Sequence, residues 1–413
     1  MAFQSGLSGL NASSQQLDVI GNNVSNANTV GFKQSRVLFA DVYANSLSGS
    51  GSSSIGIGTK VAAIEQDFTQ GAVTTTSNPL DVAINGKGFF RLSDNGTISY
   101  TRGGQFHVDN SGYIVTADNL NVTGYGVDAA GNIVATAPAP MQMSNSQLPP
   151  TATTSFRLSF NLDSGEAPPT TAVFNATDAT SYNRSTSGSV IDSLGNTHVF
   201  TTYFVKTATP GQWNLHATVD GTAVSNVNLG AGAGNPVAIN FNSSGMLSSA
   251  MPIAGVGLTV GGGAVSPLKF DVAFSGSTQF GASFGVNSLV QDGFASGRLA
   301  GFSVSANGTM VGSYTNGQSR NLGQFVLANF SDPRGLSPQG GGRWIETADS
   351  GLPVVGAPGS GDLGALQSSA TESSNVDLTA ELVSMITAQR VYQANAQSIK
   401  TQDQVMQTLV NLK

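Results

Sequence analysis

At both ends of the chain, apolar residues recur in alternating steps of four and three, which is the spacing of one face of an α-helix. Near the N-terminus this stripe has two gaps, at Ser14 and Gly21, and Gly31 follows as a residue that could end the helix. The pattern predicts an N-terminal helix of roughly 30 Å. Its apolar stripe consists of Phe3, Leu7, Leu10, Leu17 and Val24.

The C-terminal end carries the same stepping over a longer stretch. Neither Pro nor Gly interrupts residues 376–413, so a helix of roughly 50–55 Å is expected there. Ser374 and Asp377 have the spacing of a capping box just before this helix, while Gln389 and Asp403 are polar gaps in its stripe. The apolar stripe consists of Leu378, Leu382, Met385, Tyr392, Ile399, Met406 and Val410, and it is widened by Val383, Ile386, Val405, Leu409 and Leu412.

Two helices of this length need partners for their apolar stripes. The gaps weaken a two-helix coiled coil, because polar residues at seam positions cost stability. We therefore expect the termini to pair weakly, or to stay disordered in the isolated subunit, and to become buried against neighbouring subunits. The alternative is an ordinary helix pair that closes a domain within one chain, and the periodicity does not decide between them.

Between the helices, the pattern changes to short β-strands separated by turns. Residues 45–60 form a Gly/Ser-rich linker. Residues 212–219 place Trp213 and three further apolar residues on one face, as expected for a half-buried strand. Asn-Gly pairs between apolar runs predict hairpins. These pairs are Asn85-Gly86, Asn95-Gly96, Asn307-Gly308 and Asn316-Gly317.

These elements predict a mixed, mainly β protein with a nested, multidomain arrangement. The N- and C-terminal helices pair as a coiled coil, one β-rich domain is built from both halves of the chain, and a second is inserted between them. Four prolines in residues 137–150 mark the boundary. The predicted parts are a terminal helical domain (1–32 and 370–413), a connecting region (33–71 and 359–369), a discontinuous β-rich domain (72–148 and 288–358) and an inserted outer β-rich domain (149–287).

The composition argues against several classes of function. The chain has 17 Lys and Arg against 24 Asp and Glu, a formal net charge of −7, which argues against binding nucleic acid or anionic lipid. The acidity could mark an interaction surface or serve solubility alone. Cysteine is absent, which excludes disulfides and thiol catalysis. We expect neither membrane insertion nor a cleaved signal peptide, because no long apolar run and no basic N-terminal region occur.

Residues suited to catalysis or metal binding are few and dispersed. The three histidines do not have the spacing of a zinc site. The carboxylates have no paired partner in sequence that would indicate glycoside hydrolysis. We therefore expect no catalytic, cofactor-binding or metal-binding residues, and no enzyme. The residues considered are His107, His198, His216, Asp192, Asp220 and Asp271.

Residues 17–44 contain Asn22-Asn23 followed by Asn26, Thr29, Gly31 and Phe32. This motif is similar to the signature near the start of subunits of the flagellar rod and hook axial protein family. Residues 373–413 resemble the family's C-terminal helix, and residues 61–92 and 342–351 are similar to its β-domain. The large middle insertion favours a hook subunit over a rod subunit, because rod subunits are generally shorter. The signature residues are Asn22, Asn23, Asn26, Thr29, Gly31 and Phe32.

The resemblance implies a structural function. Hook subunits polymerise into a curved, flexible tube, a universal joint that passes motor torque from rod to filament. Their terminal helices line the inner tube around the export channel, and their β-domains form the outer layers. They are exported unfolded, without a cleaved signal, to the extracellular hook. The implied partners are further copies of the chain, the hook cap, the distal rod, the hook–filament junction proteins and the flagellar type III export apparatus.

Other interpretations remain open from sequence. Asn22 and Asn23 could satisfy backbone groups where the N-terminal helix ends, or could contact neighbouring subunits. The whole chain could be a distal rod subunit or a hook–filament junction protein. A β-rich surface adhesin or polysaccharide-binding protein would need a secretion signal and leaves the two helical stripes unexplained. A β-rich glycosidase would need a clustered carboxylate pair.

Overall fold

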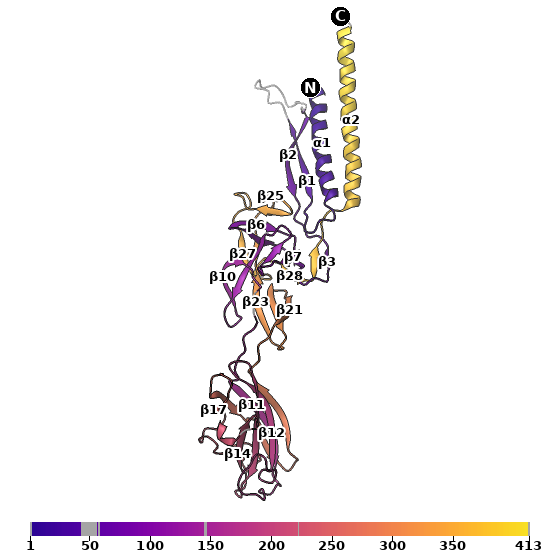
Figure 1. The fold of residues 1–413 in the computed structure, drawn as a ribbon. Coiled ribbons are helices and arrows are strands. Elements are labelled where there is room, and N and C mark those ends of the chain that lie inside the picture. The colour runs from indigo at the N-terminus through magenta and orange to yellow at the C-terminus, as the bar shows by residue number, and fades with distance from the viewer. Residues whose placement is uncertain (1, 43–55, 57, 144–146, 222, 412–413) are drawn as a thin grey trace. The chain divides into compact units, whose positions relative to one another are not determined.

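The computed structural model describes residues 2–42, 56, 58–143, 147–221 and 223–411. Strands predominate, as predicted (Figure 1). The chain divides into two compact units. We call the first the terminal unit; it comprises Met1–Asn145, Gly301–Ser313 and Ser319–Lys413. We call the second the inserted unit; it comprises Ser146–Ala300 and Tyr314–Gln318.

Both predicted terminal helices are present and pair with each other. α1 spans Ala2–Ser25 and α2 spans Leu378–Asn411, and they lie side by side (Figure 1). α1 also contacts an antiparallel ribbon of β1 (Ser35–Val42) and β2 (Gly58–Gln66). The predicted Gly/Ser linker at 45–60 lies largely outside the described residues, and its last part, from Gly58 onward, belongs to β2 instead.

The start of α2 differs from the prediction. Asp377 is itself the N-cap, because its Oδ1 accepts hydrogen bonds from the backbone N–H of Thr379 at 2.8 Å and of Ala380 at 3.2 Å. The Ser374 hydroxyl lies before the helix and accepts from the N–H of Val376 at 3.3 Å. The predicted capping box is therefore wrong: a single aspartate caps the helix, one turn later than Ser374.

A thirteen-stranded sheet forms the centre of the terminal unit, counted over the described residues. Two strand pairs beside it bring the C-terminal segment back to the N-terminal half: β3 (Val73–Thr75) with β29 (Ala370–Glu372), and β4 (Val82–Asn85) with β28 (Ala365–Ser368). The sheet contains β5 (Phe89–Asp94), β6 (Thr97–Thr101), β7 (Phe106–Val108), β8 (Ile114–Thr116), β9 (Asn121–Val127), β10 (Ile133–Pro140), β21 (Leu299–Val304), β22 (Thr309–Tyr314), β23 (Ser319–Phe325), β24 (Leu327–Asn329), β25 (Ser337–Gly340), β26 (Arg343–Ile345) and β27 (Val354–Gly356).

Three of the four predicted Asn-Gly hairpins are confirmed. Asn95-Gly96 joins β5 to β6 with φ of 48° and 100°, the pattern of a type I′ turn. Asn307-Gly308 joins β21 to β22, and Asn316-Gly317 joins β22 to β23. The hairpin at Asn85-Gly86 is wrong, because β4 buries its apolar residues while pairing with β28 and the turn only redirects the chain into β5.

The inserted unit is a sandwich of two sheets around one aromatic core. The rings of Phe160 and Phe204, one from each sheet, lie 4.5 Å apart. The strand predicted at 212–219 is confirmed as β14 (Gln212–Val219), with Trp213 fully buried. One sheet contains β11 (Ser155–Asp163), β15 (Val227–Asn228), β17 (Ile253–Leu258), β18 (Leu268–Ala273), β19 (Thr278–Phe280) and β20 (Gly285–Gln291). The other contains β12 (Arg184–Ile191), β13 (Thr197–Lys206), β14 and β16 (Val237–Asn240).

The inserted unit is longer than expected. Its sheet includes β20, which pairs with β11 and carries the unit past the predicted end at residue 287. Two short 3₁₀ helices complete the secondary structure of the described residues, at Val224–Asn226 and Pro333–Gly335. None of the helices in the described part of the chain is long and apolar enough to span a membrane.

Candidate assembly site

The two helices run antiparallel, and contacts in both halves of α1 define their register. A Cβ on Gly9 would lie 2.7 Å from Nδ2 of Asn395, so the helices approach closely there. Near the other end of α1, Nδ2 of Asn23 donates a hydrogen bond to Oε1 of Glu381 at 3.2 Å. Gly9 and Asn23 are about two heptads apart, as are Glu381 and Asn395, so one register holds along the pair.

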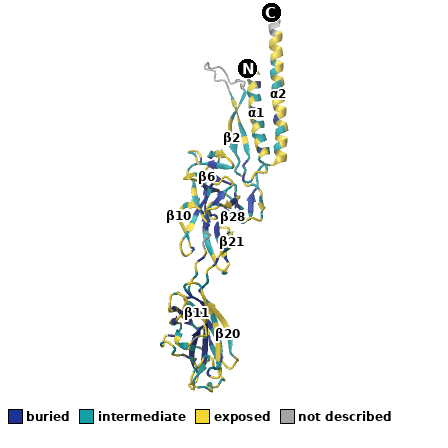
Figure 2. Ribbon diagram, viewed as in Figure 1, coloured by how far each residue is buried: buried dark blue, intermediate teal, exposed yellow. Residues whose placement is uncertain are grey.

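Most of the predicted apolar stripe is not covered by this pairing. On α1, Phe3 is 53% and Leu7 is 44% exposed. On α2, Leu382, Ile386 and Met406 are between 49% and 59% exposed. Figure 2 shows exposed positions along most of the length of α2. The other stripe residues are exposed at Leu378 and Tyr392 and half-buried at Leu10, Leu17, Val24, Met385 and Ile399. The side chain of Val410, like those of Leu409 and Leu412, lies outside the described part of the chain.

The face of α1 that is buried within the chain is offset from the predicted stripe. Its residues are mostly small or polar, and they pack against α2 and the β1–β2 ribbon. The buried positions are Gly6, Ala12, Ser13, Ile20 and Asn23. Apolar periodicity alone pointed to the uncovered face, because the positions that make contact within the chain carry little apolar surface.

Asn23 joins three elements of the terminal unit. Its side-chain amide bonds the backbone of Ser35 twice: Nδ2 donates to the carbonyl at 2.8 Å, and Oδ1 accepts from the N–H at 2.9 Å. With the additional bond to Glu381, the buried Asn23 links α1 to β1 and to α2. The side chain therefore satisfies the backbone of an adjacent strand and not the end of its own helix.

The remaining signature residues follow the end of α1. This helix ends at Ser25, earlier than Gly31, and Nδ2 of Asn26 donates to the carbonyl of Asn22 at 3.0 Å. Gly31 is buried at φ 72° and donates its N–H to the carbonyl of Glu372 at 2.8 Å. The exposed Asn22, together with Asn26, Thr29 and the half-buried Phe32, lines a pocket of about 310 Å³ beside the β25–β26 turn.

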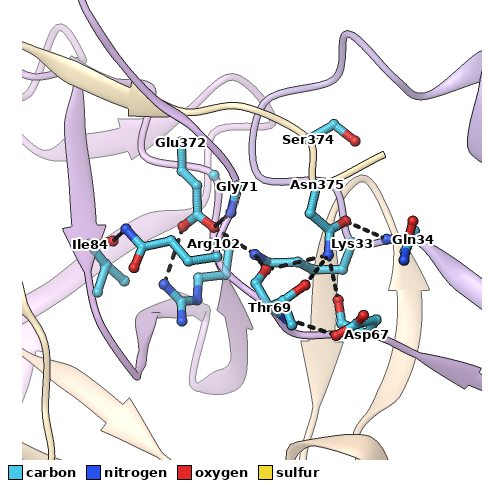
Figure 3. Close-up of polar contacts among 12 residues, drawn as sticks. Lys33, Gln34, Asp67, Thr69, Gly71, Ile84, Arg102, Glu372, Ser374 and Asn375 are labelled. Atoms are coloured by element: carbon cyan, nitrogen blue, oxygen red, sulfur yellow. Dashed lines mark hydrogen bonds and ion pairs between the residues drawn. The ribbon is translucent and has the colours of Figure 1, made fainter. Parts of the chain in front are cut away.

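A buried charge cluster joins the N-terminal and C-terminal segments of the terminal unit (Figure 3). The carboxylate of Glu372 accepts from Nζ of Lys33 at 2.6 Å and from Nη1 of Arg102 at 3.2 Å. It also accepts from the N–H of Gly71 at 3.0 Å, while Lys33 donates to the carbonyl of Thr69 at 2.6 Å. Glu372 therefore connects three segments: Lys33 just after the signature residues, Gly71 just before β3, and its own strand β29, which leads to α2.

Asn375 extends this connection toward the start of α2. Its Oδ1 accepts from the N–H of Gln34 at 2.8 Å. Its Nδ2 donates to the carbonyl of Asp67 at 2.8 Å and to the hydroxyl of Thr69 at 3.0 Å (Figure 3). Asn375 thus connects the residue just before β1 and the segment that enters α2 to the loop at residues 67–69.

Burial governs the electrostatics of this cluster. It lowers the pKa of Lys33 and of Arg102, and the charge and hydrogen bonds of Glu372 oppose that lowering. Sequence analysis did not select these three residues. Two features of the sequence could have pointed to Lys33. Charged residues make up only 10% of the chain, and Lys33 directly follows Gly31 and Phe32 of the signature.

The structure brings together two carboxylates that are far apart in the sequence of the inserted unit. Nδ1 of His198 lies 2.7 Å from Oδ2 of Asp220, and Nε2 lies 3.2 Å from Oδ2 of Asp192. Both ring nitrogens are therefore occupied by carboxylates. In the described part of the chain, no group of three or more His, Asp or Glu side chains is arranged to hold a metal ion.

Four family models match successive parts of the chain. The Flagella basal body rod protein model matches residues 3–33, and the Flagellar hook protein FlgE/F/G D1 domain model matches residues 83–161. The Flagellar basal body protein FlaE D2 domain model matches residues 161–294. The Flagellar basal body rod FlgEFG protein C-terminal model matches residues 367–412. The matches therefore cover both helices, strands β5 to β10 of the main sheet and most of the inserted unit.

Similar proteins cover the full length. Flagellar hook protein FlgE of Escherichia coli (strain K12) is 41% identical over 419 residues, which is 100% of both chains. Flagellar hook protein FlgE of Treponema pallidum (strain Nichols) is 32% identical over 457 residues, covering 99% of this chain and 98% of that protein. The crystal structure of Helicobacter pylori flagellar hook protein FlgE2 shares the fold, with a TM-score of 0.50 at 14% identity, covering 73% of this chain and 99% of that one. The chain thus belongs to the flagellar hook protein family.

Proposed function

We propose that this chain is the repeating subunit of the flagellar hook. Copies of it assemble into a curved, flexible tube that passes motor torque from the rod to the filament and encloses the export channel. The observation that carries this proposal is the uncovered apolar surface of α1 and α2. Leu382, Ile386 and Met406 are about half exposed on α2, which packs mainly against α1 within the described part of the chain.

The energetics favour burial of this surface by other copies. Fully burying one such side chain stabilises by about 1.5–3 kcal/mol relative to leaving it exposed. Exposed apolar side chains also occur on α1 and on the ribbon that packs against it, where Phe3, Phe39 and Ile64 are about half exposed. Many large apolar side chains left exposed on neighbouring elements are typical of an interaction site.

We assign the inner, polymer-forming part of the subunit to the helical stripes. The residues proposed to pack against neighbouring copies are Phe3, Leu7, Leu10, Leu17, Val24, Leu378, Leu382, Met385, Ile386, Tyr392, Ile399, Met406 and Val410. The β-rich parts, with the inserted unit outermost, form the outer layers. The match of a rod-protein model to residues 3–33 and of a rod C-terminal model to residues 367–412 supports a shared inner part.

The proposed partners and location follow from this function. Besides further copies of the chain, they are the hook cap, the distal rod, the hook–filament junction proteins and the flagellar type III export apparatus. The chain reaches the extracellular hook without a cleaved signal. Its function is mechanical and needs no enzymatic activity.

The test is polymerisation of the purified chain, followed by light scattering and electron microscopy. The double variant Leu382→Ser/Ile386→Ser should lose most polymerisation while its monomer unfolds like the wild type, because both side chains are already exposed. Gln393→Ser, at another exposed position of α2, is the matched control and should polymerise normally. Normal tubes from the double variant would exclude these residues from the interface and contradict the proposal.

A further inference from the structure

His198 connects two turns at one end of the inserted unit. It lies in β13, two residues after the turn at 192–196, and Asp220 directly follows β14. Nδ1 of His198 lies 2.7 Å from Oδ2 of Asp220, and its Nε2 lies 3.2 Å from Oδ2 of Asp192. Because both partners are acceptors, both ring nitrogens must donate, and only the imidazolium form of histidine can do so. This geometry therefore requires a charged ring.

The charged groups that act on this ring are the same two carboxylates, within the described part of the inserted unit. The loop at residues 259–267 contacts the turn through Val265, whose N–H donates to Oγ of Ser193 at 2.9 Å, and the loop contains no charged residue. Asp292 accepts hydrogen bonds from Thr154 and Ser155 instead. The charge of the ring is thus set by Asp192 and Asp220.

Asp192 organises the turn between β12 and β13 and is fully buried. Its carboxylate accepts from the N–H of Leu194 at 2.8 Å, and from the N–H and Nδ2 of Asn196, both at 2.9 Å. His198 supplies the fourth donor. In a neutral ring that keeps the shorter bond to Asp220, the lone pair of Nε2 points at the buried carboxylate of Asp192. Two acceptors that face each other without a proton between them are destabilising when buried, so loss of the proton weakens this turn.

The same turn lies against the two segments through which the chain enters and leaves the inserted unit. We call residues 147–153 the entry segment and residues 291–297 the exit segment. A Cβ on Gly195 would lie 2.9 Å from Cβ of Pro150 in the entry segment and 3.5 Å from the backbone N of Ser296 in the exit segment. The turn therefore contacts both segments closely.

Hydrogen bonds join these segments to each other and to the end of β12. The N–H of Thr153 donates to the carbonyl of Ile191 at 2.9 Å, and its Oγ1 accepts from the N–H of Ile191 at 2.8 Å. Oγ1 of Thr153 also donates to Oε1 of Gln291 at 3.0 Å. Thr151 and Phe294 exchange two backbone bonds, at 2.9 and 3.0 Å. Because the segments are linked in this way, displacement of the turn affects both of them.

We propose that protonated His198 is a pH-sensitive latch that holds the turn between β12 and β13 against the entry and exit segments. When the ring loses its proton, the turn separates from His198 and the two segments lose the surface that supports them. Burial lowers the pKa of His198, but the hydrogen bonds to Asp220 and Asp192 raise it, so the pKa lies above 6.5. The latch is therefore closed below pH 6.5 and opens as pH rises through the folded-state pKa. It is a property of the single chain and does not depend on polymerisation.

The test is amide hydrogen exchange of the full-length chain at pH 6 and pH 9, measured by mass spectrometry and corrected for the intrinsic effect of pH on exchange. Protection of the turn and of the entry and exit segments should fall at least tenfold between these pH values. The hairpin at residues 240–248 begins at the opposite end of the same sheet, where Asn240 pairs with Gln212. Its protection should change less than twofold.

The variant Asp220→Asn separates the latch from a general effect of pH. Nδ2 of the asparagine can donate to a neutral Nδ1 of His198, which leaves Nε2–H for Asp192, so both partners are satisfied without a charged ring. Protection at pH 9 should then stay within threefold of its value at pH 6. His216→Gln is the matched control, because it removes the other histidine of the inserted unit, whose ring stacks on Phe174 at 4.1 Å. It should keep the pH dependence of the wild type.

Four results would overturn the inference. The first is equal protection of the turn at both pH values. The second is a fall of the same size in the hairpin at residues 240–248, which would mean that pH acts on the whole unit. The third is a turn that loses protection while the entry and exit segments keep theirs, which would mean that the turn does not hold them. The fourth is an unchanged pH dependence in Asp220→Asn, which would assign the effect to another group.

Discussion

Nζ of Lys33 lies 2.6 Å from Oε1 of Glu372, and neither side chain is exposed to solvent. The two residues are 339 positions apart, so their ion pair closes the terminal unit by joining its first and last segments. Arg102 adds a second cation to the same carboxylate at 3.2 Å. The terminal unit thus depends on one buried anion that is supplied from the C-terminal segment just before α2.

Removing that anion should destabilise the terminal unit strongly. In Glu372→Gln two cations remain buried without a counter-charge, and breaking a buried pair in this way costs about 3–5 kcal/mol. Chemical denaturation of the full chain, followed at the terminal unit, measures the loss. Glu65→Gln is the matched control: it removes the exposed pair with Arg36, at 3.5 Å, and should cost less than about 1 kcal/mol. Equal losses in the two variants would contradict the role of burial.

Asn23→Ala should destabilise the isolated subunit, because it leaves the backbone of Ser35 without its two side-chain partners. A cost of about 1–3 kcal/mol is expected for losing partners of buried polar groups. Asn22→Ala should have little effect on the same unfolding curve, since that side chain is exposed. If Asn23→Ala leaves monomer stability unchanged but prevents polymerisation, Asn23 acts between copies and the intrachain role is wrong.

Two glycines near the end of α1 should respond in opposite directions to alanine. Gly31 has φ 72°, and a Cβ there would collide with the backbone of Arg102 and Gly103, so Gly31→Ala should destabilise the terminal unit severely. Gly21 lies inside α1 with open space around its Cα, so Gly21→Ala should stabilise the helix by about 1 kcal/mol. Thermal unfolding of both variants measures the effects, and destabilisation by both would contradict this distinction.

The inserted unit should lose stability as pH rises above neutrality. Burial would lower the pKa of His198, but its bonds to Asp220 and Asp192 outweigh burial and raise the pKa above 6.5. A raised pKa in the folded state gives stability that is fully present below about 6.5 and is lost as pH rises through the folded value. His216, whose pKa is lowered by burial, acts in the opposite direction.

The contribution of His198 can be isolated by comparison with His198→Gln. Unfolding of the inserted unit is followed by the fluorescence of Trp213 in a Trp344→Phe background, between pH 6 and 9. The wild type should lose stability relative to His198→Gln across this range, while the effect of His216 is common to both proteins. Parallel pH profiles would show that the carboxylate contacts of His198 carry no net stability.

Features set by local sequence were predictable. The Asn95-Gly96 turn requires positive φ at both positions, and the strand at 212–219 follows from the alternation that buries Trp213. The capping box at Ser374 and the hairpin at Asn85-Gly86 were predicted wrongly. Both local patterns were compatible with the predictions. The strand before Asn85-Gly86 pairs with the distant β28, however, and Asp377 caps α2 in place of Ser374.

The junction between the two ends could not be predicted from spacing. Lys33, Arg102 and Glu372 show no periodicity relative to one another, and only the fold brings them within hydrogen-bonding distance. The helical stripes consist of apolar residues, but the residues of α1 that are buried within the chain are mostly small or polar. Periodicity analysis detects apolar surface and therefore indicated the face that the isolated chain leaves uncovered.

The most direct test of the account is immunogold electron microscopy of sheared flagella with an antibody against residues 149–287. This segment lies within the inserted unit, which the proposal places on the outside of the tube. We expect label confined to the short curved segment between the basal body and the filament. Label absent from that segment but present on the rod, at the filament junction or over the cell surface would contradict the assignment to the hook.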